Sequence, residues 1–368
     1  MKYYLIAGEA SGDLHGSHLI KELKKLDADS EFCAWGGDLM ASAGAEIQKH
    51  YKELAFMGFI EVLMNIRTIL KNFKICKQNI LDFKPDALVL IDYPGFNLRM
   101  AKWAKAQGIK VYYYISPTVW AWKENRVEII RENVDRMFTV LPFEKQFYKD
   151  RNYEVDYVGH PLLDHIENYV PKDLPGVPKN KRIIALLPGS RKQEIANILH
   201  TLLELSKLKK DLHFVIAMAP GQEEAFYKNF INEDLQNVSL VRDRTYDLFS
   251  LSEAAMVTSG TATLEAGLFK VPQVVVYKTS AISYAIAKRL VKVKYISLVN
   301  LIMDKGLVTE LIQEDFTLEN CKSELEKLLD GSTQEALKKE YEHLHLLLGK
   351  AGASKKTAGL IYDYLRNV

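Results

Sequence analysis

The sequence has few cysteines, no long apolar run and almost no net charge. Its three cysteines are widely scattered among 368 residues, so neither a disulfide framework nor a Cys-rich metal site is indicated, and lone thiols are typical of a reducing cytoplasm. No stretch approaches the roughly 18 apolar residues of a membrane-spanning helix, and the apolar run at 3–7 is too short for a secretion signal. With 49 basic and 47 acidic side chains, the chain lacks the broad positive charge typical of nucleic-acid-binding proteins.

Short apolar runs alternate with longer helical patterns along the whole chain. Strands that alternate with helices in this way are typical of parallel sheets covered by helices on both faces. The predicted strands are 3–7, 32–35, 87–91, 111–115 and 137–141 in the first half, and 183–187, 213–218, 254–258 and 273–277 in the second. The alternation predicts an α/β protein with two Rossmann-like, doubly wound domains.

A break separates the two sets of strands. Between 161 and 182 the sequence is polar and contains Pro171, Pro175 and Pro178, which indicates a linker, and from Gln334 onward the pattern is helical. Two doubly wound domains would place a functional site in a central cleft between the carboxyl ends of their strands. The polar motifs at strand ends are therefore the first candidates for chemistry.

The motif GEASGD at 8–13 follows the first strand and precedes a helical pattern. A glycine-rich turn of this kind presents backbone N–H groups at a helix N-terminus, which suit a phosphate or sugar oxygen. Glu9, Ser11 and Gly12 are therefore candidate ligand contacts. A tight turn in which Ser11 or Asp13 caps the helix explains the pattern equally well. The motif lacks the fingerprints of a dinucleotide site, a P-loop and a nucleophile elbow.

Asp92 ends the very apolar strand predicted at 87–91. An acid at the carboxyl end of a central strand points into the cleft, where partial desolvation raises its pKa toward that of a useful general base. Position thus makes Asp92 the strongest catalytic candidate. The alternative is a carboxylate that only caps the following turn.

Two turns in the second half are candidate anion sites. Gly189, Ser190 and Arg191 follow one strand and combine backbone donors with a guanidinium, which would neutralise a diphosphate. SGTATLE at 259–265 follows another strand, with small hydroxyl residues at a helix N-terminus and a glutamate that could accept both hydroxyls of a ribose. Two such turns indicate a nucleotide diphosphate, although a solvated turn and a self-sufficient capping box remain open. The candidates in the second turn are Ser259, Gly260, Thr261, Thr263 and Glu265.

The stretch at 56–74 is more apolar than one core-facing helix stripe requires, and its basic residues gather near its end, as in a helix that lies in a membrane interface. An ordinary core helix with solvated lysines is the alternative. The predicted membrane contacts are Phe56, Met57, Phe59, Ile60, Leu63, Met64, Arg67 and Lys71.

No metal site is predicted. The one Asp-x-Asp sequence, at 27–29, lies in a helix-to-strand loop instead of at a strand end, and His343 and His345 have no third ligand nearby in the sequence.

The sequence closely resembles the lipid-A-disaccharide synthase family, whose members are inverting glycosyltransferases of the GT-B fold. Nine stretches carry this resemblance, and they occur in order along nearly the whole chain. They are GEASGD at 8–13, LAFMGFIEVL at 54–63, IDYPGFN at 91–97, ISPTVWAW at 115–122, LPFEKQFY at 141–148, VGHPLLD at 158–164, LLPGSRKQE at 186–194, SGTATLE at 259–265 and AKRLVKVKYISLVNLI at 287–302.

The resemblance implies a separate role for each part of the chain. Residues 1–165 would bind the lipid acceptor and carry the membrane-interacting helix, residues 166–345 would bind the UDP-linked donor, and a helix in 346–368 would pack back onto the N-terminal domain. The substrates would be UDP-2,3-diacylglucosamine and 2,3-diacylglucosamine 1-phosphate, and the products a β-1,6-linked disaccharide 1-phosphate and UDP.

The resemblance also implies roles for individual residues. Asp92 would be the base that deprotonates the acceptor 6-hydroxyl, and it would act without a paired acid, because Gly95 stands where many relatives have a second one. Asn300 would be a second catalytic residue, near the reacting sugars, with Glu310 as a substrate contact in the same segment. Arg191 and the two turns would hold the UDP moiety, and no metal or other cofactor is expected.

Acylated substrates imply a cytoplasmic protein attached peripherally to the inner membrane, and the resemblance leaves open whether the protein forms a homodimer. Two other readings stay open: another UDP-sugar enzyme of the same fold, including an epimerase, or a nucleotide-binding, membrane-associated protein without turnover.

Overall fold

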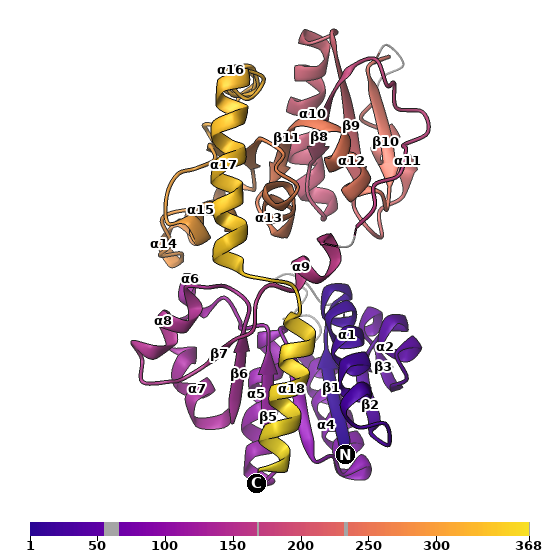
Figure 1. Cartoon of the computed structure of the whole chain (residues 1–368), viewed down its shortest axis with the longest axis vertical. Coiled ribbons are helices and arrows are strands. Elements are labelled where there is room, and N and C mark those ends of the chain that lie inside the picture. The colour runs from indigo at the N-terminus through magenta and orange to yellow at the C-terminus, as the bar shows by residue number, and fades with distance from the viewer. Residues whose placement is uncertain (55–65, 168, 232–234, 368) are drawn as a thin grey trace. The chain divides into compact units, whose positions relative to one another are not determined.

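The computed structural model describes residues 1–54, 66–167, 169–231 and 235–367. The chain divides into two compact units, which are described separately. Unit 1 comprises Met1–Asp164 together with Lys350–Val368, and unit 2 comprises His165–Gly349. The chain thus leaves unit 1 once and returns to it with its last helix (Figure 1).

Unit 1 is built on a seven-stranded parallel sheet with the order β3-β2-β1-β4-β5-β6-β7. Its strands are β1 (Lys2–Ala7), β2 (Glu31–Gly36), β3 (Glu46–His50), β4 (Ala87–Ile91), β5 (Lys110–Tyr114), β6 (Arg136–Thr139) and β7 (Asp156–Tyr157). Its helices are α1 (Ala10–Leu26), α2 (Asp38–Ser42), the 3-10 turn η1 (Tyr51–Glu53), α4 (Ile66–Phe83), α5 (Pro94–Ala106), α6 (Val119–Trp122), α7 (Arg126–Asn133), α8 (Glu144–Lys149), α9 (Pro161–Ile166, which runs into unit 2) and α18 (Ala353–Arg366).

Unit 2 repeats the arrangement with six parallel strands in the order β10-β9-β8-β11-β12-β13. Its strands are β8 (Arg182–Leu187), β9 (Leu212–Met218), β10 (Val238–Arg242), β11 (Ser252–Thr258), β12 (Gln273–Tyr277) and β13 (Glu310–Ile312). Its helices are α10 (Lys192–Leu208), α11 (Glu224–Lys228), α12 (Thr245–Leu251), α13 (Thr261–Leu268), α14 (Ala281–Leu290), α15 (Leu298–Met303), α16 (Leu318–Leu328) and α17 (Gly331–Leu348).

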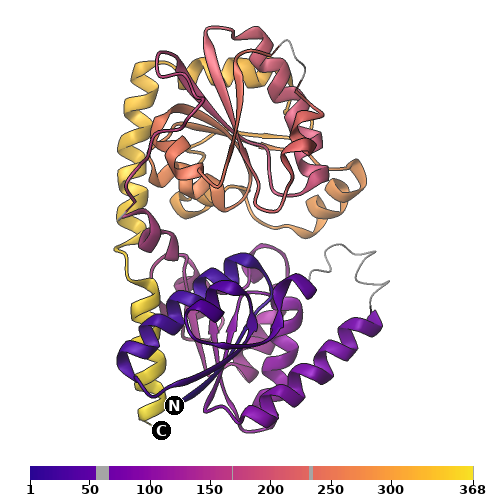
Figure 2. The ribbon, with the colours of Figure 1, turned by 90° about the vertical axis from the view of Figure 1, so that its right-hand side faces the viewer.

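Each sheet is buried between layers of helices, as Figure 2 shows for both units. A parallel strand covered on both faces requires an unbroken apolar run, and every residue of Ala87–Ile91 is fully buried. The two strand orders are those of doubly wound sheets, so the predicted fold class is confirmed.

The C-terminal helix α18 lies along α1 in both views (Figures 1 and 2). The carboxylate of Asp164 accepts hydrogen bonds from the backbone N–H groups of Gly352, Ala353 and Ser354, and so caps the start of this helix. One carboxylate therefore joins the outgoing and returning segments of the chain within unit 1.

All nine predicted strands are present, with ends that differ by at most two residues. The sequence did not predict β3, β7, β10 and β13, which are short or partly polar. All four are edge strands of their sheets, and none of them shows a complete apolar run. In the described part of the chain, no helix is long and apolar enough to cross a membrane.

Candidate functional site

Four of the predicted site motifs lie at the point where the strand order of each sheet reverses. In unit 1, β1 and β4 are neighbours with Ala7 beside Ile91, so Glu9 and Asp92 follow adjacent strand ends. In unit 2, β8 and β11 are neighbours, so Ser190 and Ser259 do the same. Ligands of doubly wound sheets bind outside the carboxyl ends of the strands at such reversals. The topology therefore forms one candidate site in each unit.

The backbone around Asp92 is strained in a specific way. Asp92 and Tyr93 both have left-handed φ values, 45° and 48°, which side chains with a Cβ rarely adopt. The Asp92 carbonyl accepts hydrogen bonds from the Asn97 side-chain amide at 2.8 Å and from the Tyr113 hydroxyl at 2.5 Å. Asn97 and Tyr113 are fully buried. These two side chains hold the turn in the conformation that presents the Asp92 carboxylate.

Gly8 completes the turn from the neighbouring strand. A Cβ built on Gly8 would lie 2.3 Å from the Tyr93 ring, so only glycine lets this ring pack over the end of β1. A Cβ built on Gly12, in the first turn of α1, would lie 3.0 Å from the Cβ of Ala7. The glycines of the GEASGD motif thus allow close packing between α1, β1 and the Asp92 turn.

The electrostatic environment of Asp92 suits a general base. Burial, followed by the negative charge of Glu9, raises the pKa of Asp92 to about 6. Asp92 is half-buried, whereas Glu9 and Ser11 are exposed. The carboxylate is therefore ionised near neutral pH, accessible to a ligand and more basic than an ordinary aspartate.

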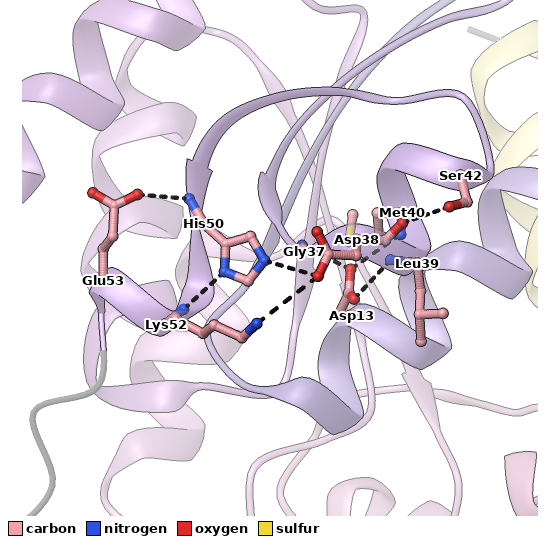
Figure 3. Close-up of polar contacts among 9 residues, drawn as sticks. All are labelled: Asp13, Gly37, Asp38, Leu39, Met40, Ser42, His50, Lys52 and Glu53. Atoms are coloured by element: carbon pink, nitrogen blue, oxygen red, sulfur yellow. Dashed lines mark hydrogen bonds and ion pairs between the residues drawn. The ribbon is translucent and has the colours of Figure 1, made fainter. Parts of the chain in front are cut away.

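Asp13 has a structural task in this motif (Figure 3). Its buried carboxylate accepts hydrogen bonds from the backbone N–H groups of Gly37, Leu39 and Met40 at 2.7 to 3.1 Å. It therefore caps the N-terminus of α2, an element remote in sequence, and not α1 as the sequence had suggested. Figure 3 also shows Asp38, which pairs with His50 and Lys52 at the surface.

The Gly189 turn of unit 2 already holds an anion from the chain itself. The Glu194 carboxylate, in the first turn of α10, accepts a 2.9 Å hydrogen bond from the Ser190 backbone N–H. Gly189 has a φ of 114°, and a Cβ there would clash with the Glu194 side chain. Because anions bind at the N-termini of helices, Glu194 occupies the position expected for a ligand phosphate. Arg191 is exposed beside it.

In the second anion turn of unit 2, some polar groups bond to the protein and others face solvent. The buried Thr263 hydroxyl donates to the Gly260 carbonyl, and the Ser259 hydroxyl donates to the Ile296 carbonyl, both at 2.8 Å. Gly260 and Thr261 are exposed at the start of α13. The Gly260–Thr261 backbone and the Thr261 hydroxyl are therefore the groups of this turn that face solvent, whereas the hydroxyl groups of Ser259 and Thr263 bond to the protein backbone.

Glu265 lies farther along the same helix. Its carboxylate accepts a 3.1 Å hydrogen bond from the Tyr246 hydroxyl. Burial raises its pKa. A carboxylate that one donor fixes in place keeps acceptor positions for two neighbouring hydroxyl groups, as the predicted ribose contact requires.

Asn300 and Glu310 belong to one buried network. The Asn300 amide donates to the Val308 carbonyl and to Glu310, and its oxygen accepts from the Val308 N–H, each at 2.9 Å. Glu310 also accepts from the backbone N–H groups of Ile296 and Ser297 and from the Ser297 hydroxyl. Both side chains are thus occupied in fixing the segment after α14. The catalytic role predicted for Asn300 stays a prediction.

The predicted membrane contacts are only partly described. Phe56, Met57, Phe59, Ile60, Leu63 and Met64 lie outside the described residues. Arg67 and Lys71 are exposed on the first turns of α4, next to Leu70, whose surface is 54% exposed. Among the described residues, no three His, Cys, Asp or Glu side chains cluster as the ligands of a metal ion would.

Sequence reasoning missed the side chains that support the site. Tyr113 and Asn97 hold the Asp92 turn, Glu194 fills the phosphate position, and Tyr246 orients Glu265. Asn97 and Glu194 stand within the recognised motifs, but periodicity gives no sign of a side chain that bonds the backbone of another element.

Solved structures support the fold. A UDP-GlcNAc 2-epimerase from Neisseria meningitidis bound to UDP-GlcNAc aligns over 100% of both chains, with a TM-score of 0.66 and 17% identity. The complex of S. aureus MnaA with UDP aligns over 100% of this chain and 97% of that chain, with a TM-score of 0.71 and 14% identity. The calicheamicin glycosyltransferase CalG4 aligns over 100% of this chain and 98% of that chain, with a TM-score of 0.63 and 15% identity. These likenesses establish the GT-B type of fold.

Relatives found by sequence identify the family more specifically than the solved structures do. The lipid-A-disaccharide synthase of Geobacter metallireducens is 38% identical over 370 positions, which cover 98% of this chain and 96% of that protein. The enzyme of the same name from Syntrophus aciditrophicus is 38% identical over 364 positions, which cover 96% and 95%. The family model described as lipid-A-disaccharide synthetase matches residues 3–362. The chain therefore belongs to the lipid-A-disaccharide synthase family of glycosyltransferases.

Proposed function

We propose that the chain transfers the diacylglucosaminyl group of UDP-2,3-diacylglucosamine to the 6-hydroxyl of 2,3-diacylglucosamine 1-phosphate. The products are the β-1,6-linked disaccharide 1-phosphate and UDP. The observation that carries the assignment is the Asp92 carboxylate, half-buried at the strand reversal of unit 1, with a pKa raised to about 6.

Asp92 is the general base in this proposal. As the acceptor oxygen attacks the anomeric carbon of the donor, its proton passes to the Asp92 carboxylate, and the bond from that carbon to the UDP oxygen breaks with its electron pair leaving on the diphosphate. A single displacement inverts the anomeric carbon and needs no enzyme nucleophile. A well-placed base of this kind contributes about 10²- to 10⁴-fold in rate.

Unit 2 binds the UDP moiety. The Ser190 N–H and the Arg191 guanidinium neutralise the diphosphate as charge develops on it, and the Gly260–Thr261 turn supplies further backbone donors. Glu265 accepts the ribose hydroxyls. The Glu194 carboxylate leaves the Ser190 N–H when the diphosphate binds, because two anions cannot share this donor.

Asn300 and Glu310 act as positioning residues. Their network fixes the Ile296–Ser297 backbone, which also accepts the Ser259 hydroxyl. Unit 1 carries the acceptor, with Glu9, Ser11 and Gly12 beside Asp92. The stretch at 56–71 contacts the cytoplasmic face of the inner membrane, from which the acylated substrates are drawn.

The test is product analysis by mass spectrometry and NMR. The purified protein is given both diacylated substrates, with and without EDTA, and UDP-GlcNAc replaces the donor in a parallel reaction. We expect a β-1,6-linked disaccharide 1-phosphate in equal amounts with and without EDTA, and only from the diacylated donor. Epimerised UDP-sugar, or UDP binding without product, would overturn the assignment.

A further inference from the structure

Three basic side chains from different elements follow the carboxyl ends of β4 and β5 in the chain and lie close enough for their charges to interact. Arg99 lies on α5, the helix that begins directly after the Asp92 turn, and Lys123 and Arg126 flank the start of α7, which packs against α5. In Figure 1, α6, which ends next to Lys123, lies at this same end of the sheet of unit 1. We call Arg99, Lys123 and Arg126 the basic cluster.

An exposed aromatic ring joins two members of the cluster. Trp122 is 42% exposed, and the Lys123 ammonium lies 4.0 Å and the Arg126 guanidinium carbon 5.8 Å from the centre of its ring. The ring therefore holds both cations on one surface. Arg99 approaches from α5, where its guanidinium lies 5.7 Å from the centre of the Phe73 ring.

The cluster has no anionic counterpart in the described part of the chain. No described acid forms an ion pair with any of its three side chains. The two nearest acids in sequence are engaged elsewhere, Glu124 with Arg151 and Glu128 with Arg131. Half-burial and the mutual repulsion of the cations lower the pKa values of Arg126 and Lys123. Such a group of cations favours an anionic ligand.

The cluster is also next to the candidate base. Arg126 lies close enough to Tyr113 for its charge to act on that hydroxyl, which donates to the Asp92 carbonyl. An acceptor sugar whose 6-hydroxyl contacts Asp92 carries its 1-phosphate on the far side of the ring oxygen, one sugar ring away. We propose that Arg99, Lys123 and Arg126 bind this phosphate monoester, with Trp122 against the sugar, and thereby select the phosphorylated acceptor.

This assignment rests on the proposed function for the identity of the acceptor, but its test does not depend on turnover. Equilibrium binding of 2,3-diacylglucosamine 1-phosphate and of 2,3-diacylglucosamine is measured in neutral detergent for wild type, Arg126→Gln and the control Arg131→Gln on the same helix. Binding of the same three proteins to anionic phospholipid vesicles is measured in parallel. Unfolding temperatures and UDP affinity confirm that each variant is folded.

We expect wild type and Arg131→Gln to prefer the phosphorylated lipid by about 10- to 100-fold, since hydrogen bonds to charged groups contribute on that scale. Arg126→Gln should lose most of this preference and bind the unphosphorylated lipid as wild type does. An equal loss of affinity for both lipids in Arg126→Gln, or a preference for the phosphorylated lipid that this variant retains, would overturn the assignment. So would an effect of Arg126→Gln that appears only on anionic vesicles, because the cluster would then bind the membrane surface. Product formation by wild type is scored separately and decides the proposed function alone.

Discussion

The hydroxyl of Tyr113 donates a 2.5 Å hydrogen bond to the backbone carbonyl of Asp92, from beneath the turn that presents the candidate base. Together with the Asn97 amide, it holds two consecutive residues with left-handed φ values that side chains with a Cβ rarely adopt. In the proposed reaction, catalysis would therefore depend on side chains that contact no substrate.

Replacement of Tyr113 by phenylalanine tests this dependence. Tyr113→Phe keeps the buried ring and removes only the hydroxyl, so we expect kcat to fall by about 3- to 10-fold with little change in either KM, as for the loss of one hydrogen bond. Tyr112→Phe, on the opposite face of β5, is the matched control. Equal effects of the two substitutions on kcat would argue against a positioning role.

The charge of Glu9 should contribute, after burial, to the position of the acid limb of the pH profile. Asp92 acts as a base only when ionised, so kcat/KM should fall about tenfold per pH unit below its pKa of about 6. Glu9 raises this pKa, and Glu9→Gln should therefore move the acid limb to lower pH. Asp29→Asn, on an exposed loop, should leave the limb in place. A limb that stays fixed in Glu9→Gln would contradict the contribution of Glu9 to the pKa of Asp92.

Asp13 should matter for stability. Asp13→Asn leaves at least one backbone N–H at the start of α2 without its carboxylate acceptor, and we expect the free energy of unfolding in urea to fall by about 1–3 kcal/mol. Asp38→Asn, on the exposed side of the same helix, should change it by less than about 0.5 kcal/mol. A similar loss in both variants would contradict the capping role.

Glu194 should oppose nucleotide binding. Its carboxylate occupies the Ser190 N–H that the diphosphate is expected to use, so Glu194→Gln should bind UDP about 3- to 10-fold more tightly, most clearly at low salt. Glu204→Gln, farther along α10 and paired with Lys207, serves as the control. Weaker binding of UDP by Glu194→Gln in calorimetry would show instead that the carboxylate supports the site.

The strands that position the site could be predicted because burial on both faces leaves an unbroken apolar run, as in Ala87–Ile91. Edge strands such as Glu46–His50 and Val238–Arg242 escaped prediction, since their exposed positions carry polar residues. The same limit applies to the site itself. Asp92 was evident from its place after a strand, whereas the fixed turn around it depends on Tyr113, more than 20 residues away, through a contact that no local pattern records.

The roles of buried polar residues were harder still to predict. A strand-end motif does not reveal whether a hydroxyl or amide faces a ligand or the protein backbone, and Thr263 and Asn300 both bond to the backbone of unit 2. Likewise, the sequence offered too many lysines and arginines to choose a phosphate site. Only the packing of α5 against α7 brought Arg99 and Arg126 together.

The most direct test of the central assignment is the single-turnover rate of Asp92→Asn with both diacylated substrates, measured beside wild type and Asp29→Asn. We expect the variant to bind UDP normally and to form disaccharide about 10²- to 10⁴-fold more slowly than wild type, while Asp29→Asn retains the wild-type rate. Disaccharide formation by Asp92→Asn at the wild-type rate would contradict the assignment of Asp92 as the base.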